Sequence, residues 1–269
     1  MSRPSGNFFG VNFCMTRKFL EMKKMLKFYS VSTHPGSNGE YFYNNFFSYY
    51  KFNASYKALS VPDLKMWLDT SEAHDAEGFS VSMPYKESIV LHLHSQDKYV
   101  DQFGSCNTVK TIGGSLQGFN TDYYGLESTL SLIPSHFSIQ ILGDGAMSRG
   151  YQRLLNNQNR GYSVYSRKLD NWGDRNIEFD CRINTTAIGT INSDSPLEGK
   201  ISSKLVIDLS IKENQLTKDC EEGGIKYIGG MFFYKEVFLN QFEIYTKIQP
   251  DAEYFDYLLL KKHREKSSH

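Results

Sequence analysis

Two short segments carry most of the polar side chains that a reaction would need. One is residues 80–87, SVSMPYKE. The other begins at Cys106-Asn107-Thr108 and continues to residues 118–125, GFNTDYYG. Each follows a short apolar run, where a strand is expected to end in a loop. Together they supply an amine, a carboxylate, amides and several hydroxyls. This set suits binding of a polyhydroxylated small molecule and transfer of a proton on it.

A third segment has the pattern of a nucleotide-binding turn. The apolar run 139–142 is followed by Gly143, Gly145 and Ala146. Glycines let backbone N–H groups approach a pyrophosphate, and the positive end of a following helix adds to the attraction. Short glycine turns are common, but a position between a predicted strand and a predicted helix favours dinucleotide binding. Asp144 stands inside the turn, and its carboxylate would repel phosphate unless it points outward.

The end of the next predicted strand carries Ser166, Arg167 and Lys168. NAD-binding proteins place an acidic residue there for the ribose 2′-hydroxyl. Two cations suit a 2′-phosphate instead, so the charge favours NADP over NAD. The alternative is a solvated basic turn with no ligand. With the glycine turn, these residues predict a dinucleotide-dependent oxidoreductase.

Two different patterns of elements must position these groups. Up to about residue 121, strands and helices alternate irregularly, with a hairpin around Gly113-Gly114. From residue 122 a regular strand–helix alternation begins, which is typical of a parallel sheet covered on both faces. The predicted strands are 26–32, 54–59, 78–83, 109–112, 116–119, 138–142, 163–166, 181–185 and 205–208. The predicted helices are 41–50, 61–68, 87–93, 237–245 and 252–262.

The composition is globular and without charge bias. The chain has 269 residues with 30 basic and 30 acidic side chains, so nucleic acid is not an expected partner. No apolar run approaches the roughly 20 residues that span a bilayer, so no membrane is expected either.

Four cysteines lie far apart without Cys-x-x-Cys spacing, which favours free thiols in a reducing cytoplasm. His92 and His94 have no third ligand at a useful spacing, so no metal is expected.

Residues 1–26 differ from the rest of the chain. The segment 16–27 is basic, and a secretory signal would need a continuous apolar core that is missing here. We expect a disordered extension, with Met25 as a plausible true start. A targeting or partner-binding arm is the alternative.

Several motifs in matching order resemble the shikimate dehydrogenase family over roughly residues 27–247. Ordered matches across most of a chain are far more specific than any one of them. Residues 80–87 are similar to the family's Asn-Val-Thr-x-Pro-His-Lys-Glu, 107–108 to its Asn-Thr step, 120–125 to its Asn-Thr-Asp-x-x-Gly, 166–168 to its Asn-Arg-Thr, 183–189 to its Ile-Asn-Ala-Thr-x-x-Gly and 242–245 to its closing helix.

The resemblance implies an α/β fold with two domains after the extension at 1–26. Residues 27–121 would form an α/β substrate-binding and catalytic domain with an open mixed sheet. Residues 122–229 would form a Rossmann-like NADP-binding domain, and the helices of 230–269 would return to the substrate domain. It also implies a cytoplasmic enzyme of chorismate and aromatic amino acid biosynthesis. Its partner would be a small-molecule substrate, and it would be a monomer or homodimer.

The reaction that the resemblance implies is the reversible reduction of 3-dehydroshikimate to shikimate with NADPH, with Lys86 and Asp122 as the catalytic pair. The ammonium would supply a proton or a positive charge to the developing alkoxide. The carboxylate would fix the lysine and accept a substrate hydroxyl. The predicted substrate-binding residues are Ser37, Ser82, Lys86, Asn107 and Asp122. The predicted NADP-binding residues are Gly143, Gly145, Ala146, Ser166, Arg167, Lys168, Thr185 and Gly230.

Departures from the family concentrate on substrate contacts. Its early loop reads His-Ser-x-Ser-Pro; here Ser37 is kept, but Gly39 and Glu40 replace the second serine and the proline. The family's tyrosine after a later strand falls at Ile211, and its closing-helix glutamine falls near Val237, with Lys235 adjacent. Three hypotheses remain. The protein is a divergent shikimate dehydrogenase with Ser37, Asn107 and Lys235 holding the acid; or a dehydrogenase for a quinate- or aminoshikimate-type substrate; or a non-catalytic, regulatory nucleotide-binding paralogue.

Overall fold

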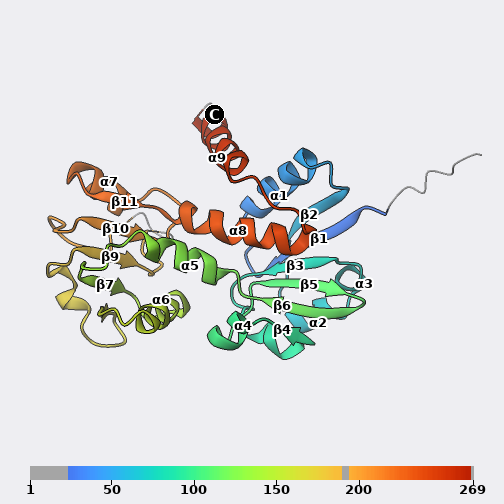
Figure 1. Cartoon of the computed structure of the whole chain (residues 1–269), viewed down its shortest axis with the longest axis horizontal. Helices are drawn as coiled ribbons and strands as arrows, with labels where there is room; N and C mark the ends of the chain where they lie inside the picture. Colours follow the sequence, from blue (N-terminus) through green and yellow to red (C-terminus); the bar gives the residue numbers. More distant parts are fainter. Residues whose placement is uncertain (1–23, 190–193, 268–269) are drawn as a thin grey trace, which may run out of the picture.

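The molecule has two lobes, each built on its own β-sheet (Figure 1). The structure, a computed structural model, describes residues 24–189 and 194–267, with only the backbone of 266 and 267. Within these residues no helix is long and apolar enough to cross a bilayer. The disordered extension predicted for residues 1–26 falls largely outside the described residues. Strand β1 already begins at Leu26.

The first lobe holds a six-stranded mixed sheet in the order β2-β1-β3-β5-β6-β4. Strands β2 and β3 pair with β1 in parallel, and β5 pairs antiparallel with both β3 and β6. Three short helices and a 3₁₀ helix connect the strands after α1. The elements are β1 (Leu26–Ser32), α1 (Asn38–Tyr49), β2 (Ala54–Ser60), α2 (Leu64–Leu68), α3 (Ser71–His74), β3 (Gly78–Val81), η1 (Ser88–His92), β4 (Ser95–Gln96), α4 (Lys98–Phe103), β5 (Thr108–Ile112) and β6 (Ser115–Phe119).

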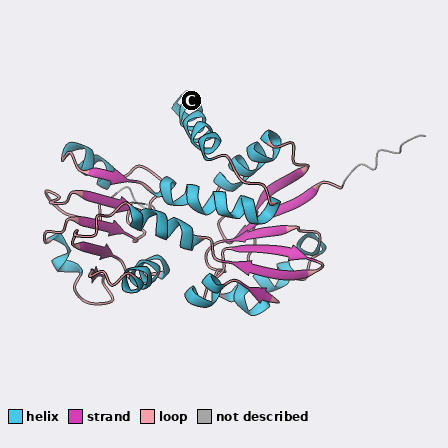
Figure 2. Cartoon of the chain, viewed as in Figure 1, coloured by secondary structure: helices cyan, strands magenta, loops and turns pink. Residues whose placement is uncertain are grey.

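The second lobe holds a five-stranded sheet in the order β11-β10-β9-β7-β8, with every pairing parallel. Every residue of β7, β9 and β10 is buried, as expected for strands covered on both faces. Figure 2 shows helices on either side of this sheet. The elements are β7 (Ile139–Leu142), α6 (Ala146–Asn157), β8 (Ser163–Tyr165), η2 (Trp172–Asn176), β9 (Cys181–Asn184), β10 (Leu205–Asp208), α7 (Gln215–Glu222) and β11 (Lys226–Ile228).

Two packed helices, α5 (Asp122–Ser131) and α8 (Gly230–Thr246), run between the lobes (Figure 1). They approach closely because α5 carries Gly125, where a Cβ atom would lie 2.6 Å from the Phe233 ring. At its far end α8 is held to the first sheet by Lys110, whose ammonium donates to the carbonyls of Ile244 at 2.9 Å and Tyr245 at 2.7 Å. A cation suits this end of a helix dipole. Helix α8 is therefore fixed at both ends, by α5 at one end and by the first sheet at the other.

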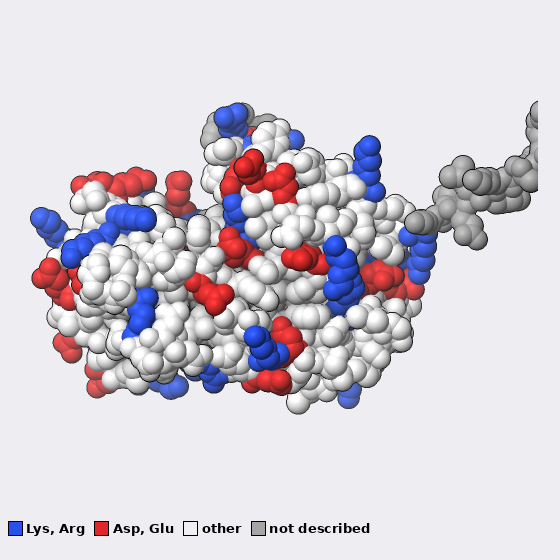
Figure 3. Space-filling model, viewed as in Figure 1, with Lys and Arg blue, Asp and Glu red and all other residues white. Residues whose placement is uncertain are grey.

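The last helix, α9 (Ala252–Ser267), covers an aromatic cluster of the first lobe. Phe255 of α9 stacks on Phe42 of α1 with ring centroids 4.3 Å apart. On the face shown in Figure 3, acidic and basic side chains are interspersed, in keeping with 30 charges of each sign.

Most of the predicted elements are present, with two errors. The helix predicted at 87–93 is the 3₁₀ helix η1. The closing helix predicted at 237–245 begins at Gly230, because Phe233 packs on Gly125 of α5 while Tyr234 packs against Phe255 of α9. A helix that is apolar on several sides lacks the one-sided periodicity that marks a helix start. Strands β4 and β11, helices α3, α4, α5 and α7 and the 3₁₀ helix η2 were not predicted; α5 spans Asp122–Ser131.

Candidate active site

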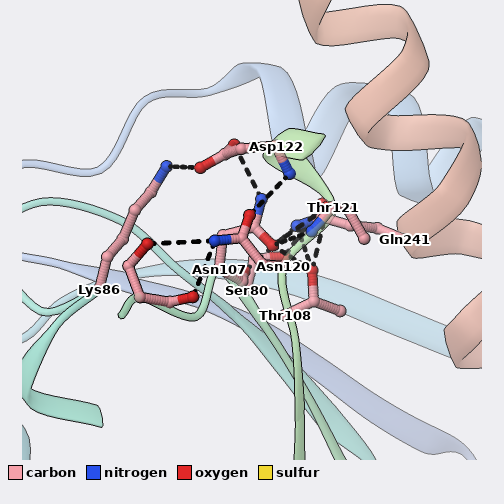
Figure 4. Close-up of polar contacts among 9 residues, drawn as sticks. Ser80, Lys86, Asn107, Thr108, Asn120, Thr121, Asp122 and Gln241 are labelled. Carbon is pink, nitrogen blue, oxygen red and sulfur yellow. Dashed lines mark hydrogen bonds and ion pairs between the residues drawn. The ribbon is translucent and has the colours of Figure 1, made fainter. Parts of the chain in front are cut away.

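An ion pair between Lys86 and Asp122 lies at the junction of the lobes (Figure 4). The Lys86 ammonium nitrogen is 2.6 Å from Asp122 Oδ2, and the two side chains are 21% and 7% exposed. Lys86 comes from the loop between β3 and η1, and Asp122 is the first residue of α5. A carboxylate in the first turn of a helix is stabilised by the helix dipole. The arrangement holds a charged amine beside a nearly buried carboxylate with part of the amine still accessible.

Asn107 holds the other oxygen of the carboxylate. Its Nδ2 donates to Asp122 Oδ1 across 2.9 Å, and the backbone N–H of Asp122 donates to Asn120 Oδ1 at 3.1 Å. The orientation of the Asn107 amide is set by its own oxygen, which accepts from the Thr121 N–H at 2.9 Å and from the Thr108 hydroxyl at 2.8 Å. Asn107 therefore presents its N–H₂ group to Asp122 in a fixed direction.

Gln241 of α8 supports this group from behind and was not predicted. Its Nε2 donates to the Thr108 hydroxyl at 2.8 Å and to the Asn107 carbonyl at 3.2 Å, and its Oε1 accepts from the Tyr43 hydroxyl at 2.9 Å. The predicted glutamine position, Val237, is buried one helical turn earlier on the same face of α8. Gln241 stands four positions after the apolar Val237, on a helix face that otherwise packs into the core. A polar residue at such a position is the signal that would have identified it.

A buried group of hydroxyls adjoins Gln241. Ser80 Oγ accepts from the Tyr56 hydroxyl at 2.8 Å and lies 3.0 Å from the Tyr245 hydroxyl. Burial raises the pKa of Tyr43, Tyr56 and Tyr245 well above the usual range for a phenol. These phenols stay neutral, and Tyr43 and Tyr56 donate hydrogen bonds. Tyr56 also occupies the space beside Gly39, where a Cβ would lie 2.9 Å from the ring.

The glycine turn borders a cavity of about 620 Å³ at the carboxyl ends of β7 and β9. Gly143 has φ of +106°, and a Cβ there would lie 2.8 Å from Thr185 Oγ1, so only glycine suits this position. Beside Gly145 the space is open, which lets a ligand approach the backbone at the start of the 12-residue helix α6. The cavity is lined by Gly143, Asp144, Gly145, Ser166, Arg167, Lys168, Trp172, Thr185, Thr186, Ala187 and Ile188.

Six of the eight residues predicted to bind the coenzyme line this cavity. The other two do not. Ala146 lines a smaller recess together with Asp122 and Glu87, and Gly230 lies under the Leu209 carbonyl, 2.4 Å from where its Cβ would stand. Trp172 lines the cavity and was not predicted, because it lies at the start of η2, just beyond the basic turn.

The predicted substrate residues are not all gathered at the ion pair. Asn107 touches Asp122, whereas Ser37, at the start of α1, and Ser82, after β3, are exposed and hydrogen bond to neither Lys86 nor Asp122. Lys235, considered for the substrate acid, is paired with Asp256 of α9 at 2.6 Å. Ile211 is exposed. In the described part of the chain, no three His, Cys, Asp or Glu side chains are grouped to hold a metal ion.

Comparison with known proteins agrees with the motifs. Residues 37–109 match the family model described as the shikimate dehydrogenase substrate binding domain. A shikimate dehydrogenase (NADP(+)) of Methanococcus maripaludis strain S2 is 31% identical over 234 residues, 75% of this chain and 84% of that protein. The chain belongs to the shikimate dehydrogenase family. The matched domain contains Lys86 and Asn107, and Asp122 lies beyond it.

Other members of the family extend the similarity to the fold. The shikimate dehydrogenase (NADP(+)) of Aquifex aeolicus is 29% identical over 213 residues, 71% of this chain and 79% of that protein. The structure of shikimate 5-dehydrogenase from Thermus thermophilus, in complex with NADP(H) and shikimate, has a TM-score of 0.75 at 21% identity and covers 88% of this chain and 99% of that one. The predicted family and the predicted α/β, Rossmann-like fold are confirmed.

Proposed function

We propose that this protein is an NADP-dependent oxidoreductase that reversibly reduces 3-dehydroshikimate to shikimate. The observation that carries the proposal is the Lys86–Asp122 pair at 2.6 Å, facing the junction between the sheet of the first lobe and the nucleotide-type turn of the second. Its relatives are named shikimate dehydrogenase (NADP(+)). The reaction is a step towards chorismate and the aromatic amino acids.

The chemistry assigned to the protein's own residues is proton transfer and charge stabilisation. NADPH, when bound, supplies a hydride to the substrate carbonyl carbon. The Lys86 ammonium donates a proton to the carbonyl oxygen as it becomes an alkoxide, and in the reverse direction the neutral amine removes it. Asp122 holds the Lys86 side chain in position through the ion pair and accepts a hydrogen bond from a substrate hydroxyl. Asn107 fixes Asp122 and directs its remaining amide hydrogen towards the substrate.

The second lobe fits NADP. The glycine turn and the first turn of α6 suit the pyrophosphate, and Arg167 and Lys168 suit the 2′-phosphate. We assign residues 27–121 and the helices of 230–269 to substrate binding, and 122–229 to the coenzyme. The described cysteines Cys106, Cys181 and Cys220 are buried free thiols, which supports a cytoplasmic location. We propose a monomer or a homodimer.

The altered loop favours a second candidate substrate. Gly39 stands where the family has a serine that holds the substrate carboxylate, and Tyr56 fills the space beside it. Ile211 and Val237 likewise cannot donate hydrogen bonds from their side chains. A quinate- or aminoshikimate-type ring, which keeps the carboxylate and differs elsewhere on the ring, is the alternative on the same reaction centre.

The decisive experiment follows NADP reduction with shikimate, quinate and related cyclic alcohols, and NADPH oxidation with 3-dehydroshikimate. Turnover on shikimate that is lost in Lys86→Met supports the main proposal. A quinate-type substrate with a higher kcat/KM would select the second candidate. Tight NADPH binding with no turnover on any cyclic alcohol would reject an enzyme and favour a regulatory nucleotide-binding paralogue.

A further inference from the structure

The coenzyme cavity contains an acidic side chain that opposes its basic ones. Asp144 lies within the glycine turn, and its Oδ2 is 3.4 Å from the Lys168 ammonium nitrogen. The carboxylate side chain is 20% exposed and the lysine side chain 80% exposed. Both line the cavity that also contains Arg167. Lys168, the lysine expected to bind a 2′-phosphate, is therefore already paired with Asp144 of the glycine turn.

The turn itself is held in place around Asp144. Arg149, at the end of the first turn of α6, donates from Nη1 to the Asp144 carbonyl at 3.2 Å and also lies 3.9 Å from Glu87 across the lobe junction. The backbone of Asp144 is thus tied to α6, and its side chain reaches the neighbouring basic turn. Among the described residues, no carboxylate lies within 4.0 Å of the Arg167 guanidinium, in contrast to Lys168.

We propose that Asp144 lowers the preference for 2′-phosphorylated coenzyme by competing with the 2′-phosphate for Lys168. The inference rests on the proposed NADP dependence and adds a residue that tunes it. A phosphate that binds Lys168 must displace the carboxylate or share the ammonium with it, and two anions sharing one cation repel each other. Arg167 then provides most of the 2′-phosphate recognition.

A pure charge effect would give a similar result for a different reason. A carboxylate in the turn weakens any bound phosphate by repulsion, including the 5′-phosphate, whatever Lys168 does. Competition requires Lys168, whereas general repulsion does not. The two can be separated by comparing ligands with and without the 2′-phosphate, and by removing Asp144 in the presence and absence of Lys168.

The test measures dissociation constants of adenosine 2′,5′-bisphosphate and adenosine 5′-monophosphate by titration calorimetry. The proteins are the wild type, Asp144→Asn, Lys168→Gln and the double variant. Asp170→Asn is the matched control, because Asp170 is an exposed carboxylate two residues after Lys168 that does not line the cavity. Thermal unfolding of each protein checks folding, and Asp144→Ser serves as a second variant.

Asp144→Asn should tighten binding of the bisphosphate about two- to fivefold more than binding of the monophosphate, the range expected for an exposed ion pair. This excess should vanish in the Lys168→Gln background and be missing in Asp170→Asn. Equal gains for both ligands, or an excess that persists without Lys168, would overturn the inference and leave the proposed function intact. If the wild type and Asp144→Asn both bind the two ligands equally well, NADP preference and the inference are rejected together, while the shikimate assay judges the reaction separately.

Discussion

Gln241 of the closing helix donates to the Thr108 hydroxyl across 2.8 Å, although 133 residues separate them in the sequence. Thr108 in turn donates to Asn107, and Asn107 donates to Asp122, which holds Lys86. An unbroken chain of hydrogen bonds therefore runs from the buried side of α8 to the proposed catalytic pair. Chains of this kind fix side-chain directions more firmly than single hydrogen bonds do.

The first prediction concerns Gln241 as a positioning residue. Gln241→Leu removes the acceptor of the buried Tyr43 hydroxyl and one of the partners of the Thr108 hydroxyl, so the free energy of unfolding should fall by about 1–3 kcal/mol. Turnover of shikimate should fall roughly tenfold at unchanged NADPH affinity, because the loss acts on Asn107 and Asp122 only. Steady-state kinetics, NADPH titration and denaturant unfolding measure the three quantities. Asn240→Leu is the control, since that amide bonds only within α8, to Glu236. Loss of stability without loss of kcat would make Gln241 merely structural.

The second prediction concerns the ion pair itself. Lys86→Met should lower kcat by about 10²–10⁴-fold, the range for loss of a general acid, and leave the dissociation constant of NADPH within about twofold. Lys65→Met, on the exposed face of α2, should leave kcat unchanged. Asp122→Asn should also lower kcat, because a neutral amide no longer forms the ion pair that positions the Lys86 amine. Wild-type turnover in Lys86→Met would reject the assignment of the catalytic pair.

Sequence patterns predicted the site better where its residues lie close together in the chain. Asn107, Asn120 and Asp122 stand in one hairpin and the helix after it, so their spacing alone predicts that they meet. The same holds for the glycine turn, where Gly143 and Gly145 are separated by one residue. Gln241 was missed because it reaches the site through tertiary packing of a distant element, and Trp172 because it lies just beyond the basic turn that the pattern covers.

The third prediction uses Trp172 as a reporter of coenzyme binding. The chain has two tryptophans; Trp172 lines the coenzyme cavity, and Trp67 is buried in the first lobe. NADPH should quench tryptophan fluorescence through Trp172, by contact or energy transfer over a short distance. The change should be largely lost in Trp172→Phe and kept in Trp67→Phe. Quenching that depends equally on both tryptophans would place the coenzyme elsewhere.

The fourth prediction is a pH dependence of stability in the second lobe. Hydrogen bonds from Lys204 and from the Ser138 N–H and hydroxyl lower the pKa of Asp180 to about 2, against 3.8 for a free carboxyl. A carboxyl whose pKa is lower in the folded state stabilises above the unfolded value, and that contribution is lost as pH falls through the folded value. Asp180→Asn should therefore lower Tm near neutral pH, with the difference from wild type closing between about pH 4 and pH 2. Thermal unfolding across this range measures it, with Asp69→Asn as an exposed control. A Tm difference that stays constant with pH would contradict the role of the charge.

The fifth prediction tests whether Tyr56 blocks the altered substrate loop. A Cβ at Gly39 would lie 2.9 Å from the Tyr56 ring, and that ring is held by stacking on Tyr43 at 4.1 Å and by its hydrogen bond to Ser80. Gly39→Ser should thus lower the free energy of unfolding by about 1–3 kcal/mol through overpacking. Gly36→Ser, just before α1 and with open space around it, should change it by less than about 0.5 kcal/mol.

Removing the Tyr56 ring should relieve the overlap with a serine introduced at position 39 and leave that serine free to contact the substrate. Adding Gly39→Ser to a Tyr56→Val background should therefore cost less stability than adding it to the wild type. If the loop determines substrate choice, Gly39→Ser/Tyr56→Val should also show a lower KM for shikimate than Tyr56→Val alone, because the new hydroxyl can hold the substrate carboxylate. Denaturant unfolding and steady-state kinetics on the four proteins measure both effects. If Gly39→Ser costs the same stability in the wild type and in Tyr56→Val, the Tyr56 ring can move aside for a side chain at position 39. Steric exclusion by Tyr56 would then not explain why this position lacks a serine.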